Sequence, residues 1–199
     1  MRDVLLILGG YLLGSMPWGY WLPRLVTGVN IRKIGSGNTG AANVWRTQGF
    51  KLGLSVALLD VAKGLAAALL GVWLGNELIG LLAGIAALIG HWRPLFIGFA
   101  RGGKIVATTG GVALALAPLP TLAVAAVWIV AFLATRYTSV ASLLSAATLP
   151  LFAILFGASW LVVAFTAGAG VAIFALHRAN IGRLLNRTEN RFELGRRTT

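Results

Sequence analysis

Seven apolar segments, separated by short polar stretches, dominate the sequence and limit what the chain can fold into. A helix that spans a bilayer needs about 20 residues, so these segments take up most of the chain. The sequence therefore predicts an all-α, polytopic integral membrane helix bundle of about seven transmembrane helices, one of them short or re-entrant. The segments run over Val4–Trp21, Leu52–Gly75, Leu78–Phe99, Ile105–Ala117 (the short one), Leu119–Tyr137, Val140–Phe156 and Trp160–Leu176.

Composition excludes several other classes of protein. With 58% hydrophobic and 11% charged residues in a chain of 199, a water-soluble domain or a disordered tail is excluded, and a separate soluble domain has no room. Unbroken apolar runs also disfavour a β-barrel. Because the chain has no cysteine, two histidines and five acidic residues, we expect neither thiolate chemistry nor a bound metal. The N-terminal apolar segment is interpreted as a retained helix, because no small-x-small cleavage site precedes Pro17.

Basic residues are unevenly distributed and predict the topology. The formal net charge is +12, and in a membrane protein the first explanation is an excess of Lys and Arg in cytoplasmic loops, not a nucleic-acid partner. With Met1 outside and Thr199 inside, only Arg2 lies outside and only Lys63 lies within a helix. We therefore expect an N-out, C-in protein that faces the cytoplasm with its polar loops and ends in a short basic tail, residues 190–199.

The first polar segment on the predicted inner face is rich in glycine. Glycines at this spacing let backbone N–H groups converge into a nest for an anion, and Arg46 can grip a phosphate through its planar fork. A flexible interhelical loop is the alternative reading. The candidate substrate-binding residues are Ser36, Gly37, Asn38, Thr39, Gly40 and Asn43, with Arg46 on the same helical face as Asn43.

A second segment, Arg101-Gly102-Gly103-Lys104, leads into a helix that starts with hydroxyl side chains, among them Thr108. It lacks the spacing of a Walker A loop. Alone, this segment is explained by the basic residues that are common in cytoplasmic loops of membrane proteins. Together with the first segment it predicts a site for two anions.

The last polar segment follows the seventh apolar run. His177 and Asn180 share a helical stripe at its inner end, where a proton acceptor is useful, although a histidine there can also serve only to cap the helix. Glu189 is interpreted as a structural partner of arginines. Ser142, in the polar segment Thr138–Ser145, is a further substrate-binding candidate.

Asp60 and Lys63 lie inside the second apolar segment. As i, i+3 neighbours they can pair, which lowers the cost of burying either charge. An intramembrane ion pair marks a functional region by default, but a role in helix packing is equally compatible with the sequence.

Taken together, these residues resemble the bacterial acyl-phosphate-dependent glycerol-3-phosphate acyltransferases of the PlsY type. The match runs in order from about Gly14 to Glu189. It is carried by Gly14-Ser15-Met16-Pro17 with Tyr20, Gly35-Ser36-Gly37-Asn38-Thr39-Gly40 with Asn43 and Arg46, Asp60 and Lys63-Gly64, Gly90-His91 with Pro94, Gly102-Gly103-Lys104 with Val106-Ala107-Thr108, His177-Arg178 with Asn180-Ile181 and Arg183-Leu184, and Thr188-Glu189.

The resemblance implies a single membrane-embedded acyltransferase domain over residues 1–199. It implies transfer of a fatty acyl group from acyl-phosphate to the 1-hydroxyl of glycerol 3-phosphate, giving 1-acyl-glycerol 3-phosphate and phosphate without a cofactor, in the bacterial inner membrane beside the enzyme that produces acyl-phosphate. The catalytic candidates are then His177, Asn180, Lys104 and Arg46, and Asp60, Lys63 and Glu189 support the structure. Either His177 or the acyl-phosphate oxygens take the hydroxyl proton.

Two positions depart from the family pattern. Ile105 and Arg187 stand where the family usually has glycine, and Ile105 removes backbone freedom from the second loop. We expect this to affect rate or substrate preference more than identity.

Two other functions share some of these sequence features. A transporter or exchanger of a phosphorylated metabolite would also have basic glycine loops, but the polar residues crowd one face and no inverted repeat is evident. A CDP-alcohol phosphotransferase would need several aspartates and a metal.

Overall fold

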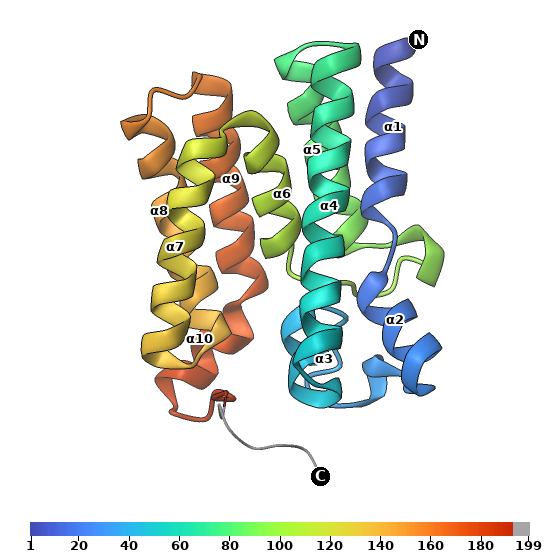
Figure 1. Cartoon of the computed structure of the whole chain (residues 1–199), viewed down its shortest axis with the longest axis vertical. Coiled ribbons are helices and arrows are strands. Elements are labelled where there is room, and N and C mark those ends of the chain that lie inside the picture. The colour runs from blue at the N-terminus through green and yellow to red at the C-terminus, as the bar shows by residue number, and fades with distance from the viewer. Residues whose placement is uncertain (193–199) are drawn as a thin grey trace. The chain divides into compact units, whose positions relative to one another are not determined.

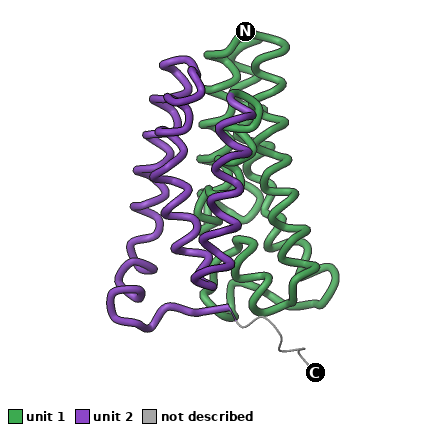
Figure 2. Tube along the Cα trace, turned by 60° about the vertical axis from the view of Figure 1, so that its left-hand side comes forward, with its two compact units in different colours: residues 1–116 green, residues 117–199 purple. Residues whose placement is uncertain are grey.

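The computed structural model describes residues 1–192, and this part of the chain is helical, without strands. It forms two compact units, one over residues 1–116 and the other over the described residues from 117 onward (Figure 2). The predicted basic tail, residues 190–199, lies mostly outside the described residues.

Unit 1 is built around one long helix, α4 (Phe50–Leu74), which packs against α1, α3, α5 and α6 (Figure 1). Its other helices are α1 (Arg2–Gly14), α2 (Trp18–Thr27), α3 (Ala41–Gln48), α5 (Glu77–Trp92) and α6 (Val106–Leu116), with short 3₁₀ turns η1 (Ile31–Lys33) and η2 (Leu95–Ile97).

The first apolar segment forms two helices instead of the single one expected. α1 ends at Gly14 and α2 begins at Trp18. Pro17 causes this break, because proline disfavours a helical conformation of the residue before it and has no N–H to donate. The 13 residues of α1 rise about 20 Å, less than a hydrocarbon core of about 30 Å.

Small residues let α6 approach α4 closely. A Cβ on Gly64 of α4 would overlap the carbonyl oxygen of Thr108, and one on Gly111 of α6 would overlap the carbonyl oxygen of Val61. Such close backbone contact is typical of helix packing in membranes. It fixes the first turn of α6 beside the residues that follow Asp60 in α4.

Unit 2 consists of α7 (Pro118–Thr135), α8 (Thr138–Leu155), α9 (Trp160–Leu176) and α10 (Arg178–Leu185). α8 packs against both α7 and α9. The chain bends by 59° between α9 and α10, at His177.

The structure confirms an all-helical membrane protein but does not confirm seven spans. Within residues 1–192, four helices are long and apolar enough to cross a membrane: α4, α5 extended to Ile97, α7 and α8. The bent pair α9–α10 raises the number to five. The expected short segment is α6, with 11 residues. Large apolar side chains such as Leu58, Leu151 and Trp160 are exposed, as suits contact with lipid.

Candidate active site

The first glycine loop lies between η1 and α3 and is organised by the buried amide of Asn43. Its Oδ1 accepts from the Ser36 N–H at 2.9 Å, and its Nδ2 donates to the carbonyl oxygens of Ile34 at 3.2 Å and Asn38 at 3.0 Å. Asn43 was expected to bind substrate. Its amide instead holds the loop backbone, so its expected contribution to phosphate binding is through the loop.

Two glycines in this loop adopt left-handed backbone conformations, with φ of 58° at Gly35 and 68° at Gly37. A Cβ at Gly35 would overlap Oδ1 of Asn43, so the loop has room only for glycine there. Ser36, between them, is exposed. The N–H groups of Ser36 and Gly37 are bonded within the loop, to Oδ1 of Asn43 at 2.9 Å and to the Ile34 carbonyl oxygen at 3.0 Å, so they are not available to the anion nest that the sequence predicts.

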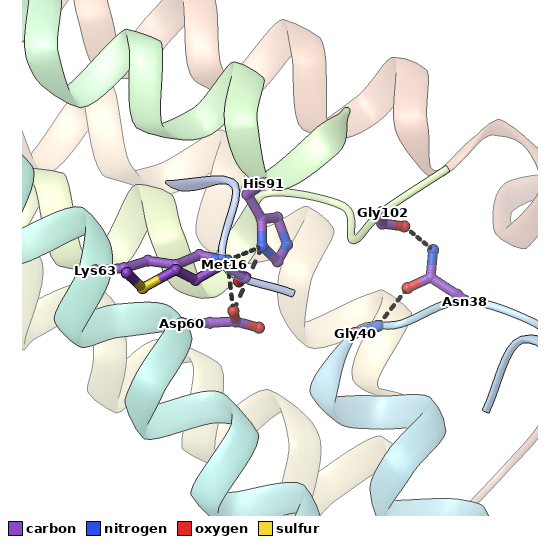
Figure 3. Close-up of polar contacts among 7 residues, drawn as sticks. All are labelled: Met16, Asn38, Gly40, Asp60, Lys63, His91 and Gly102. Carbon is purple, nitrogen blue, oxygen red and sulfur yellow. Dashed lines mark hydrogen bonds and ion pairs between the residues drawn. The ribbon is translucent and has the colours of Figure 1, made fainter. Parts of the chain in front are cut away.

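The side chain of Asn38 connects the first glycine loop to the second by a hydrogen bond. Its Oδ1 accepts from the Gly40 N–H at 2.8 Å, and its Nδ2 donates to the Gly102 carbonyl oxygen at 3.0 Å (Figure 3). The two residues of this second bond are 64 positions apart. The sequence placed both loops on one face, and the structure brings them into direct contact.

The second glycine loop folds back onto the end of α5. The Gly102 N–H donates to the Trp92 carbonyl at 2.9 Å, and the Gly103 N–H donates to the His91 carbonyl at 3.1 Å. Both glycines are buried. Since these N–H groups are already bonded, the substrate-binding role predicted for Gly102 and Gly103 has to come from the close approach that their bare backbone allows.

The second loop then enters α6 through a strained residue. Ile105 is buried, β-branched and left-handed, with φ of 58°, and its carbonyl accepts from the Thr109 N–H at 2.7 Å. Half-buried Lys104 precedes it. In the first turn of α6, the buried hydroxyls of Thr108 and Thr109 form no hydrogen bond within the described residues. Helix N-termini attract anions through their N–H groups and dipole.

Arg46 lies on α3, the helix that the first loop opens. Its Nε donates to the Ala42 carbonyl at 3.2 Å. Thr39, in the loop, is buried. The predicted loop residues, Arg46 and Lys104 therefore belong to two adjoining glycine turns and the helices that follow them.

Asp60 and Lys63 pair as expected, at 2.8 Å between Oδ1 and Nζ. The structure adds His91, whose Nδ1 lies 2.7 Å from Nζ of Lys63 and 3.4 Å from Oδ1 of Asp60. Lys63 also donates to the Met16 carbonyl at 3.1 Å, in the break between α1 and α2 (Figure 3). His91 was not among the predicted site residues, because nothing in the spacing links it to a lysine 28 residues earlier.

The Glu189 carboxylate accepts hydrogen bonds from three side chains of unit 2. It accepts from Asn180 Nδ2 at 2.6 Å, from Ser139 Oγ at 2.9 Å and from Arg183 Nε at 2.6 Å. Burial raises its pKa, but hydrogen bonds from Asn180, Ser139 and Arg183, and the charge of Arg183, lower that pKa by more, so it lies below the ordinary value of 4.5. Glu189 therefore fixes α10 to the start of α8.

His177 stands at the bend between α9 and α10. Its Nδ1 lies 2.8 Å from the Ile173 carbonyl oxygen. A carbonyl only accepts, so Nδ1 carries a hydrogen, and a neutral ring then has its lone pair on Nε2. Ser142, on α8, accepts from the Trp128 indole N–H at 3.3 Å. In residues 1–192, no group of three or more His, Cys, Asp or Glu side chains is placed to hold a metal.

Comparison with known proteins matches residues 4–187 to the family model described as glycerol-3-phosphate acyltransferase. The chain belongs to this family. A glycerol-3-phosphate acyltransferase of Desulforudis audaxviator is 47% identical over 192 residues, covering 95% of this chain and 96% of the relative. One of Sinorhizobium fredii is 47% identical over 184 residues, covering 92% and 88%.

Solved structures agree with this family. The crystal structure of PlsY, an integral membrane glycerol 3-phosphate acyltransferase, in its glycerol 3-phosphate form has a TM-score of 0.92 at 38% identity, covering 97% of this chain and 96% of that one. Its lysophosphatidic acid form has a TM-score of 0.90 at the same identity. The expected PlsY family is thus confirmed, and with it a membrane-embedded acyltransferase of phospholipid synthesis.

Proposed function

We propose that this protein transfers a fatty acyl group from acyl-phosphate to the 1-hydroxyl of glycerol 3-phosphate. The products are 1-acyl-glycerol 3-phosphate (lysophosphatidic acid) and inorganic phosphate. The observation that carries the proposal is the hydrogen bond from Asn38 to Gly102, which joins two glycine turns with cationic residues close by in sequence. Both substrates carry phosphate, and each turn offers a place for one.

The chemistry needs no covalent enzyme intermediate. The glycerol O1 attacks the acyl carbonyl carbon, a new C–O ester bond forms, and the carbon–oxygen bond to phosphate breaks. Acyl-phosphate is already activated, and the chain has no cysteine to form a thioester. Catalysis then rests on orientation of the substrates and on stabilisation of the oxyanion and the departing phosphate by Lys104 and Arg46.

The hydroxyl proton has two possible acceptors, His177 and the oxygens of the acyl-phosphate itself. His177 is suited to the task because its Nδ1–H is bonded to Ile173, which leaves the lone pair of a neutral ring on Nε2. Asn180, held by Glu189, orients His177 or the hydroxyl. On the substrate-assisted route the proton passes to a phosphate oxygen and leaves with the phosphate.

The proposed setting follows from the substrates. Glycerol 3-phosphate is water-soluble and the acyl chain is not, so the reaction belongs at the cytoplasmic face of the bacterial inner membrane. Acyl-phosphate is reactive, and an enzyme that makes it is the expected neighbour. The distribution of basic residues in the sequence supports this orientation.

Kinetics of two variants test the proposed phosphate contacts. Purified protein should release phosphate from acyl-phosphate only when glycerol 3-phosphate is added. Arg46→Ala and Lys104→Ala should each lower kcat/KM about 10-fold or more. Lys104→Arg should not restore full activity, because a planar guanidinium does not replace a compact ammonium. Near wild-type kinetics in both alanine variants, with folding intact, would exclude these contacts.

A further inference from the structure

Lys63 is the centre of a buried cluster in which each hydrogen of its ammonium group faces an acceptor. Asp60, Lys63 and His91 are 2%, 4% and 6% exposed. An ammonium group has three hydrogens. They face three acceptors: Oδ1 of Asp60 at 2.8 Å, Nδ1 of His91 at 2.7 Å and the Met16 carbonyl oxygen at 3.1 Å.

This arrangement determines which nitrogen of His91 carries the hydrogen. Lysine in its charged form can only donate, so Nδ1 of His91 accepts, and the hydrogen of the neutral ring is on Nε2. The Asp60 carboxylate pairs with Lys63, at 2.8 Å between Oδ1 and Nζ, and favours its charged form. The cluster therefore turns His91 into a donor with a fixed direction.

Nε2 of His91 is directed at the second glycine loop. A Cβ on Gly103 would overlap this atom, so the ring edge lies directly against the Gly103 backbone. Figure 3 shows the imidazole between the Asp60–Lys63 pair and the loop segment that carries Gly102. Within residues 1–192, the hydrogen bonds of the His91 side chain involve Nδ1, and none involves Nε2.

Other donors without acceptors lie close by in the same loop and helix. The hydroxyls of Thr108 and Thr109 are buried in the first turn of α6, an 11-residue helix, and form no hydrogen bond in the described part of the chain. A helix N-terminus, two hydroxyls and an imidazole N–H are all suited to an acceptor-rich anion. Burial of such donors is costly unless a ligand satisfies them.

We propose that His91 is a phosphate-binding residue, whose Nε2–H donates to a phosphoryl oxygen held at the second glycine loop. The proposal rests on the proposed function for the identity of that phosphate, which is the phosphate of either acyl-phosphate or glycerol 3-phosphate. Asp60 and Lys63 act through His91 and are positioning residues.

Two substitutions separate the two edges of the imidazole. His91→Asn places an amide oxygen near the Nδ1 position, so it can still accept from Lys63 but loses the donor that faces the loop. His91→Gln places an amide N–H near the Nε2 position and loses the acceptor for Lys63. We expect the Asn variant to keep its thermal midpoint and to raise KM for one of the two substrates roughly 10-fold or more, since that is the typical value of a hydrogen bond to a charged group.

The Gln variant gives the opposite pattern. It should be the less stable of the two proteins and yet retain the lower KM. A merely structural His91 predicts the reverse order, with Gln more impaired than Asn in both stability and KM. That order, or unchanged KM values in a folded Asn variant, would overturn the proposal.

A spectroscopic measurement does not depend on any His91 variant. The chain has two histidines, so ¹⁵N-histidine labelling gives two ring systems, and His177→Ala identifies the one that belongs to His91. We expect the Nε2–H form, and a saturable shift of its Nε2 resonance when inorganic phosphate is added that disappears in Lys104→Ala. An Nδ1–H form, or no saturable shift, would overturn the proposal.

Different results would contradict the proposed function and the proposed role of His91. If wild-type protein does not release phosphate from acyl-phosphate, the proposed function fails, while the response of His91 to inorganic phosphate still decides whether it binds an anion. If the wild type is active and His91 does not respond, the inference about His91 alone fails.

Discussion

Nδ2 of Asn38 donates to the carbonyl oxygen of Gly102 at 3.0 Å, while its Oδ1 accepts from the Gly40 N–H at 2.8 Å. One amide thus shapes the first glycine loop and attaches it to the second. The second loop is fixed from the other side by the carbonyls of His91 and Trp92 at the end of α5. This side chain therefore contributes to the relative position of the two proposed phosphate sites.

Asn38→Asp tests this dependence. The carboxylate can still accept from Gly40, but it cannot donate and it repels the Gly102 carbonyl. We expect kcat/KM to fall about 10-fold or more, with a loss of about 1–3 kcal/mol in unfolding free energy. Steady-state phosphate release and thermal unfolding in detergent measure both quantities.

Asn30→Ala is the matched control. Asn30 also caps a local turn, by accepting from the Arg32 N–H at 3.1 Å, and within residues 1–192 its hydrogen bonding is confined to this turn. It should cost stability of about 1 kcal/mol and leave kcat/KM within about twofold. Equal losses of activity in the two variants would show that the contact between loops has no special role.

Ile105 and Arg187 should respond in opposite ways to replacement by glycine. Both are left-handed, with φ of 58° and 57°. Arg187 is exposed and closes α10 in a Schellman arrangement, with its N–H bonded to Leu184 and the Thr188 N–H bonded to Arg183. Arg187→Gly relieves strain of about 1–3 kcal/mol, which exceeds the roughly 0.4–1 kcal/mol that glycine costs through the unfolded chain. It should therefore raise the unfolding free energy by about 1 kcal/mol.

Ile105→Gly relieves similar strain but also removes a buried side chain. Loss of a buried isoleucine costs about 2–5 kcal/mol, which exceeds strain of about 1–3 kcal/mol, so stability should fall. Thermal midpoints of the two variants in the same detergent provide the comparison. Stabilisation by Ile105→Gly would mean that strain at the entrance to α6 outweighs its packing.

Glu189 should make the protein less stable in acid. Its pKa lies below the ordinary glutamate value of 4.5, so the folded state favours the carboxylate. This contribution is fully present above pH 4.5 and is lost as pH falls through the lowered pKa. In Glu189→Gln, stability should be lower at neutral pH and should decline less between neutral pH and this acid range. If the unfolding free energy of Glu189→Gln depends on acid pH as that of the wild type does, Glu189 does not contribute to the loss of stability in acid.

His177→Ala tests the proton acceptor. General-base help is typically worth about 10²–10⁴-fold, so we expect at least the lower factor in kcat. Glu189→Gln should instead reduce mainly expression or thermal stability, which separates catalytic from structural roles. If His177→Ala retains nearly full kcat and a flat pH profile, the oxygens of acyl-phosphate are the acceptor.

The local features of unit 1 were largely predictable. The glycine loops follow from residue type and spacing, and the Asp60–Lys63 pair follows from helical periodicity. The contact between Asn38 and Gly102 and the addition of His91 to the ion pair did not follow, because they join residues 64 and 28 positions apart. A histidine that closely precedes a glycine loop was the available signal for His91.

The apolar pattern predicted the membrane class better than the number of spans. Hydropathy records that Val4–Trp21 is apolar but not that Pro17 interrupts it. The length of the apolar run Ile105–Ala117 did indicate a short segment, and this segment is α6, with 11 residues. Residue type also did not indicate that the amide of Asn43 is bonded to the loop backbone, and its contact with substrate stays a prediction.

A comparison of acyl donors tests the proposed reaction. Purified protein with glycerol 3-phosphate is supplied in turn with acyl-phosphate, acyl-CoA and acyl carrier protein carrying the same chain, and phosphate and 1-acyl-glycerol 3-phosphate are quantified together. We predict one phosphate per lysophosphatidic acid with acyl-phosphate, and no product with the two thioesters. Product from a thioester, or movement of glycerol 3-phosphate across vesicles without acylation, would contradict the account.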